Sequence, residues 1–263
     1  MDTIPKMEWL FNIDFASIME PLSTACINMP NAIRRNAAPV PDSAADKREM
    51  DLARRAEIGE MKRARTRAGI VQAAIRVLGQ EQGRLVTVDS VISEARISRG
   101  TFYNHFDGRD QLLQVVAYEL MHDFNDAVRS LLESETSATL RATYWMRHYM
   151  HRVRTDPRWG WALVNVSLIG PQLFAEETQR QARVNLDEGV TSGEFKVDSA
   201  EAVLDMGWGS LLAASVTILR GVASADHPEQ VVLLTLRALG VSEAKARRAI
   251  AAPLHDLRQL ALA

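Results

Sequence analysis

The sequence predicts an all-α protein, and three observations lead to that class. Of its 263 residues, 47% are apolar and 24% are charged, an ordinary balance for a globular chain. Leu, Ala, Arg, Glu and Val dominate the composition, which favours helices over sheets. From about residue 64 onward apolar residues recur with the helical period, and no alternating apolar pattern is long enough for a sheet.

The first 61 residues differ from the rest. Five of the nine prolines fall between Pro5 and Pro41, and residues 36–49 read as a linker. Two explanations stay open. Residues 1–61 are a poorly ordered extension, or the assigned start lies too far upstream and translation begins at Met50 or Met61.

Three helices are expected next. The first has one apolar face and ends near Gly83; its inward residues are Ile70, Ala73, Ala74, Val77 and Leu78. Thr87 opens a short second helix, which ends in a tight connection at Arg96-Ile97. Ser98 is a natural N-cap for the third helix. Ile97 before that cap and Phe102 after it form a hydrophobic staple.

The third helix carries an unusual set of side chains. Phe102 and Phe106 are four residues apart and are expected on its inward face, before Asp107-Gly108 breaks the helix. A long fourth helix then begins at Arg109. Its apolar stripe consists of Leu112, Leu113, Val116, Ala117, Leu120, Met121 and Phe124.

The rest of the chain is expected to be helical as well. The predicted helices cover residues 138–154, 158–166, 171–191, 199–221, 228–239 and 242–260. Asp198-x-x-Glu201 resembles a capping box. Pro228 suits a first helical position, and Gly240 ends that helix.

Two short helices joined by a tight turn, the second with a polar outer face, describe a helix-turn-helix. Arg99 can pair bidentately with guanine and Asn104 with adenine. Thr101, Tyr103 and His105 suit phosphate oxygens. Gly100 leaves room for close approach to the duplex. The amides that begin the helices near Thr87 and Arg109 can each hold a phosphate.

The charge distribution agrees with a polyanionic partner. From Lys62 to Arg109 there are nine Lys or Arg and four Asp or Glu, whereas the whole chain has a net charge of −2. The remainder therefore carries −7. A basic module on an acidic body indicates that the module binds a polyanion.

Residues 87–113, TVDSVISEARISRGTFYNHFDGRDQLL, resemble the DNA-binding motif of the TetR family of transcription regulators. The motif positions are matched by Ala95, Ile97-Ser98, Thr101, Phe102, Tyr103, His105-Phe106 and Leu112-Leu113. There are two departures: Arg96 stands where a glycine is usual, and Arg109 where a lysine is usual.

The resemblance implies a domain organisation and a set of DNA contacts. A TetR-type helix-turn-helix domain is expected at 62–124, with its motif at about 87–106, and an effector-binding and dimerisation domain at 125–263. The residues expected to contact DNA are Thr87, Arg96, Ser98, Arg99, Gly100, Thr101, Tyr103, Asn104, His105 and Arg109.

In that family the last two long helices of each subunit form a four-helix dimer interface. Independently, the predicted helix 199–221 is apolar nearly all round, which indicates burial on both sides. Aromatic residues gather in this half of the chain and suit a pocket for a small, largely apolar effector. Trp145, Tyr149 and Trp208 are the expected ligand-binding residues.

No cofactor, catalytic residue or metal site is expected. His148-x-x-His151 is compatible with a metal, but no third ligand is evident, and a solvated helix face is the favoured interpretation. Cys26 is the single cysteine, so no internal disulfide framework exists. The longest apolar run, 211–219, is too short to span a bilayer. No membrane association is expected, and a cytoplasmic location is inferred.

These observations predict a sequence-specific DNA-binding regulator, namely a ligand-responsive, homodimeric repressor on a palindromic operator. Two alternatives stay open. An enzyme with an accessory DNA-binding head would need converging titratable residues, of which only His148 and His151 are candidates. A scaffold would bind protein partners through the acidic body or the leader.

Overall fold

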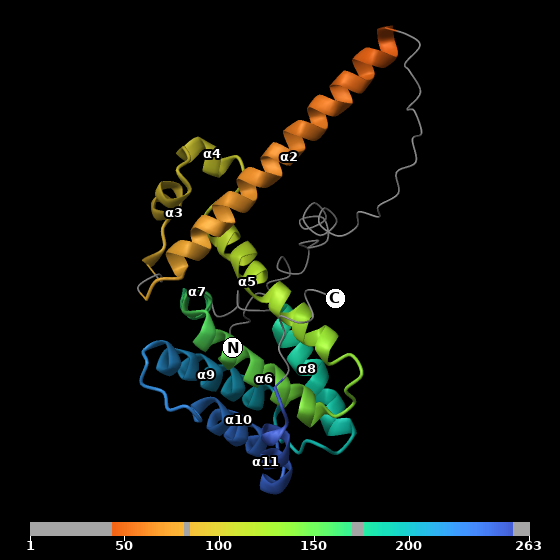
Figure 1. The fold of residues 1–263 in the computed structure, drawn as a ribbon, viewed down its shortest axis with the longest axis vertical. Coiled ribbons are helices and arrows are strands. Elements are labelled where there is room, and N and C mark those ends of the chain that lie inside the picture. The colour runs from red at the N-terminus through yellow and green to blue at the C-terminus, as the bar shows by residue number, and fades with distance from the viewer. Residues whose placement is uncertain (1–43, 82–84, 170–175, 255–263) are drawn as a thin grey trace, which may run out of the picture. The chain divides into compact units, whose positions relative to one another are not determined.

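The computed structural model describes residues 44–81, 85–169 and 176–254. Every regular element within these ranges is a helix, as the composition predicted (Figure 1). The chain divides into two units, residues 1–68 and residues 69–263.

The first described helix, α2 (Ala44–Leu78), begins far upstream of the expected position. The prediction of a linker at 36–49 and of an extension without structure up to residue 61 is therefore wrong for residues 44–61. After Pro41 the chain consists mainly of Ala, Arg, Glu, Lys and Met, which are strong helix formers. Residues 1–43 lie outside the described residues.

The helix-turn-helix head uses the last ten residues of α2, α3 (Val88–Ala95), α4 (Arg99–Tyr103) and the start of α5 (Arg109–Leu131). Its core residues are Ile70, Ala73, Ala74, Leu78, Val91, Phe102, Phe106, Leu112, Leu113 and Val116, all at most 1% exposed. The expected inward faces are thus confirmed.

Two helix ends in the head differ from the expectation. The α2 helix ends at Leu78, earlier than predicted, and Gly83 lies outside the described residues. The α4 helix ends at Tyr103, so Phe106 follows the helix instead of belonging to it. The amides of His105 and Phe106 both donate to the carbonyl of Phe102, which turns the chain and still buries Phe106.

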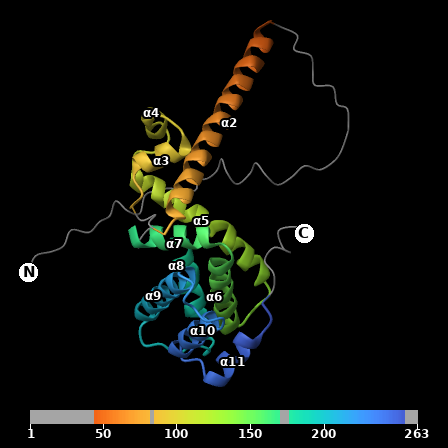
Figure 2. The ribbon, with the colours of Figure 1, turned by 60° about the vertical axis from the view of Figure 1, so that its left-hand side comes forward.

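Six helices follow in the described part of the chain after α5: α6 (Ala138–Thr155), α7 (Pro157–Ile169), α8 (Glu176–Thr191), α9 (Ala200–Leu219), α10 (His227–Ala238) and α11 (Glu243–Ala251). The α6 helix packs against each of the other five, and against α5 (Figures 1 and 2). It therefore forms the centre of this part of the core.

Two side chains of α7 join the head to the C-terminal helices. Trp159 Nε1 donates to the carbonyl of Leu120 on α5 (2.8 Å). Asn165 Nδ2 donates to the carbonyls of Leu78 and Gln80, at 2.9 and 2.8 Å. Because Asn165 is buried and Leu78 ends α2, this amide satisfies carbonyls that the helix itself leaves unpaired.

The expected capping box at Asp198 and Glu201 is wrong by one residue. Ser199 is the N-cap of α9, and its side chain accepts from the amide of Ala202. The last helix, α11, ends at Ala251 instead of near residue 260, and residues 255–263 lie outside the described residues.

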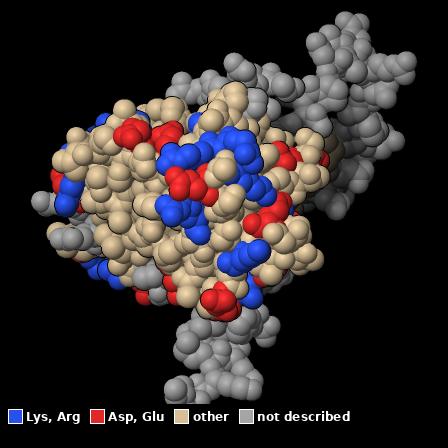
Figure 3. Space-filling model, turned by 90° about the horizontal axis from the view of Figure 1, so that it is seen from below, with Lys and Arg blue, Asp and Glu red and all other residues tan. Residues whose placement is uncertain are grey.

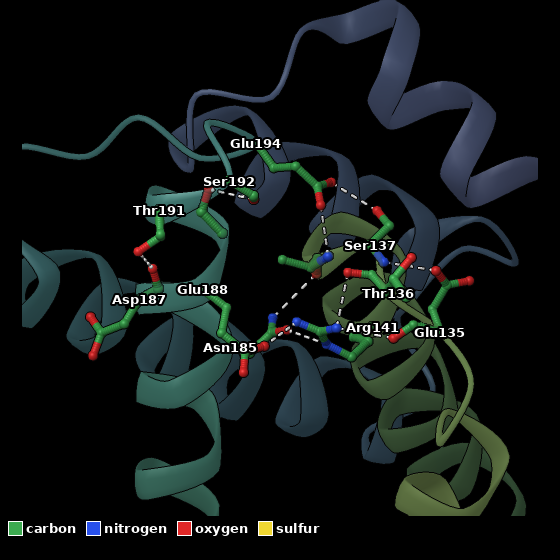
Figure 4. Close-up of polar contacts among 12 residues, drawn as sticks. Glu135, Thr136, Ser137, Arg141, Asn185, Asp187, Glu188, Thr191, Ser192 and Glu194 are labelled. Atoms are coloured by element: carbon green, nitrogen blue, oxygen red, sulfur yellow. Dashed lines mark hydrogen bonds and ion pairs between the residues drawn. The ribbon is translucent and has the colours of Figure 1, made fainter.

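The carboxylate of Glu194 holds three segments of the second unit together, and Figure 4 shows its contacts with the start of α6. It accepts from the Ser137 hydroxyl (2.8 Å), from the amide of Ala138 (2.9 Å) and from the hydroxyl of Thr139 (2.7 Å), all at the start of α6. Lys245 on α11 pairs with it at 2.7 Å. An acceptor at a helix N-terminus satisfies amides that lack helical partners.

These contacts change the titration of Glu194. Partial burial raises the pKa of its carboxyl, but the bonds from Lys245, Thr139, Ser137 and Ala138 outweigh burial and hold the pKa at about 2, against an ordinary 4.5. Because the folded pKa is depressed, the stabilisation is fully present above pH 4.5 and disappears as the pH falls toward 2.

We therefore expect Glu194→Gln to lower the free energy of unfolding at pH 7 by about 2 kcal/mol. The difference from the parent protein should narrow as the pH falls from 4.5 toward 2. Urea titrations at several pH values measure both effects. Glu188→Gln, which removes a more exposed partner of Arg141, is the control and should cost less than about 1 kcal/mol. Equal losses in the two variants would contradict the role of Glu194.

Candidate nucleic-acid interface and effector cavity

The turn between α3 and α4 depends on one left-handed residue. Arg96 has φ 55° and ψ 47°, and it is the one non-glycine residue with positive φ in the described ranges. Its amide reaches the carbonyls of Ile92 and Ser93, which ends α3. Glycine adopts this conformation without a steric penalty, so the position explains why the TetR pattern has glycine there.

Ser98 then starts α4, as the sequence predicted. Its Oγ accepts from the amide of Thr101 (3.0 Å) and lies 2.8 Å from the Thr101 hydroxyl. Phe102, one residue later, is fully buried beneath the helix. The cap fixes where α4 begins, and the buried ring fixes which side of the helix faces outward.

The outward side carries the polar residues named from the sequence. Arg99, Gly100, Tyr103 and Asn104 are exposed, whereas Thr101 and His105 are half-buried. Tyr103 is 48% exposed and its ring lies edge-on to Phe102, with the centroids 5.3 Å apart. Packing against Phe102 limits where the Tyr103 hydroxyl can point.

Arg99 forms an ion pair that the sequence did not indicate. Its guanidinium pairs with the carboxylate of Asp89 on α3, and both side chains are more than 60% exposed. Exposed ion pairs contribute little free energy, so this pair does not hold the Arg99 guanidinium firmly in place. Asp89 lies in the first turn of α3, whereas Arg99 lies on α4. The spacing of residues along a single helix does not reveal a contact between two helices.

The two expected phosphate-binding helix ends differ from each other. At α3, Thr87 and Ser90 form a reciprocal capping box, so the Thr87 hydroxyl already accepts from the amide of Ser90. At α5, Gly108 is the N-cap and no side chain caps the helix. The exposed Arg109 begins this helix, and its guanidinium lies 3.5 Å from Asp110. The start of α5 therefore offers both amides and a cation to an anion.

A cavity of ≈ 250 Å³ lies between α5, α6, α8, α9 and α10. Its wall is largely apolar, and a few polar side chains interrupt it. A cavity of this composition suits a small organic molecule. The apolar wall includes Val128, Leu132, Ala142, Trp145, Met146, Leu186, Phe195, Val203, Leu204, Trp208 and Leu211.

Of the three aromatic residues predicted to bind a ligand, two line this cavity. Trp145 and Trp208 meet edge-to-face, with ring centroids 5.7 Å apart. Tyr149 does not line the cavity: it is 2% exposed and stacks on Trp145 from behind, at 5.4 Å. Burial raises the pKa of Tyr149 to about 12, although the bond with Ser215 (3.1 Å) opposes that rise.

Polar residues of the wall were missed by the sequence interpretation. Asn125 on α5 donates to the Thr178 hydroxyl (2.8 Å) and accepts from the Trp145 indole (3.1 Å). Arg141 donates to Asn185 (2.8 Å) and pairs with Glu188 at 2.5 Å. The one signal in the sequence was Asn125, a polar residue directly after Phe124 and three before Val128 in an apolar stripe.

The two histidines of α6 lie in different surroundings. His148 is 3% exposed, so the expectation of a solvated face is wrong for it, whereas His151 is exposed. No group of three or more possible metal ligands occurs among the described residues.

We expect Arg96→Gly to stabilise the head, because a left-handed non-glycine residue costs about 1–2 kcal/mol. The greater backbone entropy that glycine loses on folding offsets only part of this gain. The expected gain is about 1 kcal/mol, seen as a rise in Tm of a few degrees. Ser93→Gly, in the right-handed part of α3, is the control and should lower Tm. A fall in Tm for Arg96→Gly would contradict the strain at this turn.

Two family models match the chain. Residues 70–116 match bacterial regulatory proteins of the tetR family, and residues 138–252 match the tetracyclin repressor-like C-terminal domain. The matches cover the head and the C-terminal helices, and they leave out residues 1–69. No curated protein matches the chain in sequence.

Several solved structures share this fold. RolR in complex with the ligand resorcinol has a TM-score of 0.61 and 26% identity, over 75% of this chain and 99% of that one. The fatty acid degradation regulator FadR from Bacillus halodurans gives 0.53 and 18%, over 66% and 97%. TylP, a TetR regulator from Streptomyces fradiae, gives 0.50 and 19%, over 75% and 95%. The two family models, together with the likeness to RolR, show that the chain belongs to the TetR family of DNA-binding transcription regulators.

Proposed function

We propose that this protein is a homodimeric, ligand-responsive repressor that binds a palindromic operator. The observation that carries the proposal is the exposed polar side of α4, which the left-handed Arg96, the Ser98 cap and the buried Phe102 hold in place. A side of this composition matches the hydrogen-bonding groups of the major groove.

Individual roles follow from the chemistry of each side chain. Arg99 and Asn104 read base edges, with Arg99 leaving Asp89 for guanine. The remaining contacts position the head on phosphates without reading sequence. These are made by Thr87, Arg96, Ser98, Thr101, Tyr103, His105 and Arg109, while Gly100 permits close approach.

Pairing of two copies is supported by the surface of α9 and α10. The α9 helix has 20 residues with mainly apolar side chains, yet only Leu211, Ala214, Ser215 and Ile218 are buried in the single chain. Met206 on α9 is 39% exposed and Leu234 on α10 is 62% exposed. Apolar helices left open to water in this way favour association.

The same helix has the length and composition of a membrane span. We assign its apolar surface to the second copy and not to lipid, because α9 packs against α6, α7, α8 and α10. With DNA as the partner, the site of action is the cytoplasm and no membrane association is proposed.

The effector that we propose is a small, amphipathic aromatic molecule. Trp145 and Trp208 offer ring faces and edges, and Asn125 with Thr178 offers hydrogen bonds at the wall. Arg141 is already paired with Glu188, so it does not call for an anionic ligand. The likeness to RolR, whose structure holds resorcinol, supports a phenol as the first compound to test.

Signal transfer uses α5, which runs from the head to the cavity. Arg109 and Leu113 lie at its head end, and Asn125 and Val128 line the cavity. An effector that binds more tightly to one arrangement of α5 shifts the population of the head positions. Operators with half-sites about 34–36 Å apart are then bound by one arrangement only.

Replacements on α4 and α5 distinguish the residues that position the head on phosphates from the residues that read bases. We expect Tyr103→Phe and Arg109→Ala to weaken binding to every duplex alike, whereas Arg99→Ala and Asn104→Ala also relax sequence preference, each by about 1–3 kcal/mol. Gel-shift titrations on the selected operator and on base-substituted operators measure both effects. Wild-type affinity in all four variants would contradict the assigned interface.

Gly207 provides a test of the cavity. It lines the wall, and a Cβ built there meets no other atom within 4 Å. We therefore expect Gly207→Leu to fill the cavity, to abolish the quenching of tryptophan fluorescence by resorcinol and related phenols, and to keep operator binding. Gly207→Ala adds one methyl group and is the matched control. Unchanged ligand response in Gly207→Leu would exclude this cavity as the effector site.

A further inference from the structure

We infer that the N-terminal half of α2 carries a second DNA-binding surface, which contacts the phosphate backbone of duplex outside the operator half-site. This inference rests on the proposed DNA binding by the helix-turn-helix. It adds a site that neither family model covers, since the two models match residues 70–116 and 138–252.

The first observation is an exposed basic stripe. Along residues 50–63 every side chain is exposed, and so is Arg65. At about 100° of rotation per residue, Arg54, Arg55, Lys62 and Arg65 fall within an arc of about 100° on one side of the helix. They extend over about 16 Å of its length. We call these four residues the α2 basic stripe.

No acidic residue between positions 52 and 68 lies within that arc. Glu57 and Glu60 lie on other sides of the helix, whereas Asp51 falls within the same arc at its N-terminal end, one turn before Arg55. From residue 52 to residue 68, this side of the helix therefore carries positive charge only.

The second observation is that these cations have no ion-pair partners. Within the described ranges, none of the four stripe residues forms a salt bridge or a side-chain hydrogen bond. The face shown in Figure 3, which is the side of α11 in Figure 1, differs from the α2 basic stripe. On that face, Lys and Arg atoms surround Asp and Glu atoms. On α11 itself, Arg247 pairs with Glu243 at 2.7 Å, and Lys245 pairs with Glu194.

The third observation concerns where the stripe lies along the chain. The α2 helix is continuous from Ala44 to Leu78, and its last ten residues belong to the core of the head. A strip of unpaired cations in the helix that leads into a DNA-binding head faces a high local concentration of phosphates when the head is bound. Duplex DNA carries one charge per about 1.7 Å of axis, so a stripe of this length meets several phosphates.

The test uses the full chain and two probes: the selected operator with flanks of ten base pairs on each side, and the same operator trimmed to its half-sites. The dependence of log K on log salt reports how many phosphates the protein neutralises. We expect a steeper slope on the flanked probe. Replacing the whole stripe (Arg54→Gln, Arg55→Gln, Lys62→Gln and Arg65→Gln) should remove up to about 0.9 of slope per cation on the flanked probe and little on the trimmed one.

Arg63 supplies the matched control. It is exposed and unpaired like Arg65, but it lies on the opposite side of the helix. Arg65→Gln should therefore lower the slope on the flanked probe, and Arg63→Gln should leave it unchanged. Preference for the operator over a scrambled core should be the same in all variants, because the stripe reads no bases.

Three results would overturn the inference. They are equal slopes for the parent protein on both probes, an unchanged slope after replacement of the stripe, and a loss of self-association with no change in slope, which would assign the stripe to a second copy. If the parent protein fails to bind any operator, the proposed function is at fault instead, and that outcome is distinct from the other three.

Discussion

The burial of Phe102 is the interaction on which the DNA-binding head depends. The α4 helix has five residues, too few to be stable as an isolated helix. It exists because Phe102 and Phe106 are buried in the hydrophobic core, while Ser98 caps its first amides. Because these rings are buried, the side of the segment that carries Arg99, Tyr103 and Asn104 faces the solvent. The reading surface is thus a consequence of the core beneath it.

The same requirement explains the left-handed Arg96. The chain has to leave α3 and enter α4 within three residues, and it has to keep Ile97 against the core. A left-handed residue reverses the direction of the backbone in the shortest distance. Arginine stands there at a steric cost that glycine would avoid. The stability of the rest of the head compensates for this strain.

The C-terminal helices are held together by side-chain hydrogen bonds and an ion pair as well as by apolar packing. Glu194 joins the start of α6 to α11, Asn165 holds the end of α2, and Asn125 links α5 to α8 and to Trp145. Each of these interactions connects segments that are far apart in the sequence. Such contacts make the wall of the cavity and the head parts of one connected core.

Much of this could be predicted from the sequence, for local reasons. Helical period, the caps at Thr87 and Ser98, and the inward rings are all set by residues within a turn or two of each other. The predictions that were wrong concerned features that depend on contacts between residues far apart in the sequence. The end of α4 is set by how Phe106 enters the core, and Tyr149 and Trp145 look alike in sequence although only Trp145 reaches the cavity. The early start of α2 was missed because the prolines before residue 42 suggested a linker beyond the point where helix formers take over.

The central claim is that the core of one chain presents one reading helix, and that α9 and α10 pair two such chains on one operator. Sedimentation velocity of the protein with a labelled operator duplex measures this most directly. The account predicts a dimer in the absence of DNA and a complex of two chains per duplex. A protein that stays monomeric at micromolar concentration, or that binds one chain per operator with no preference over a scrambled duplex, would contradict it.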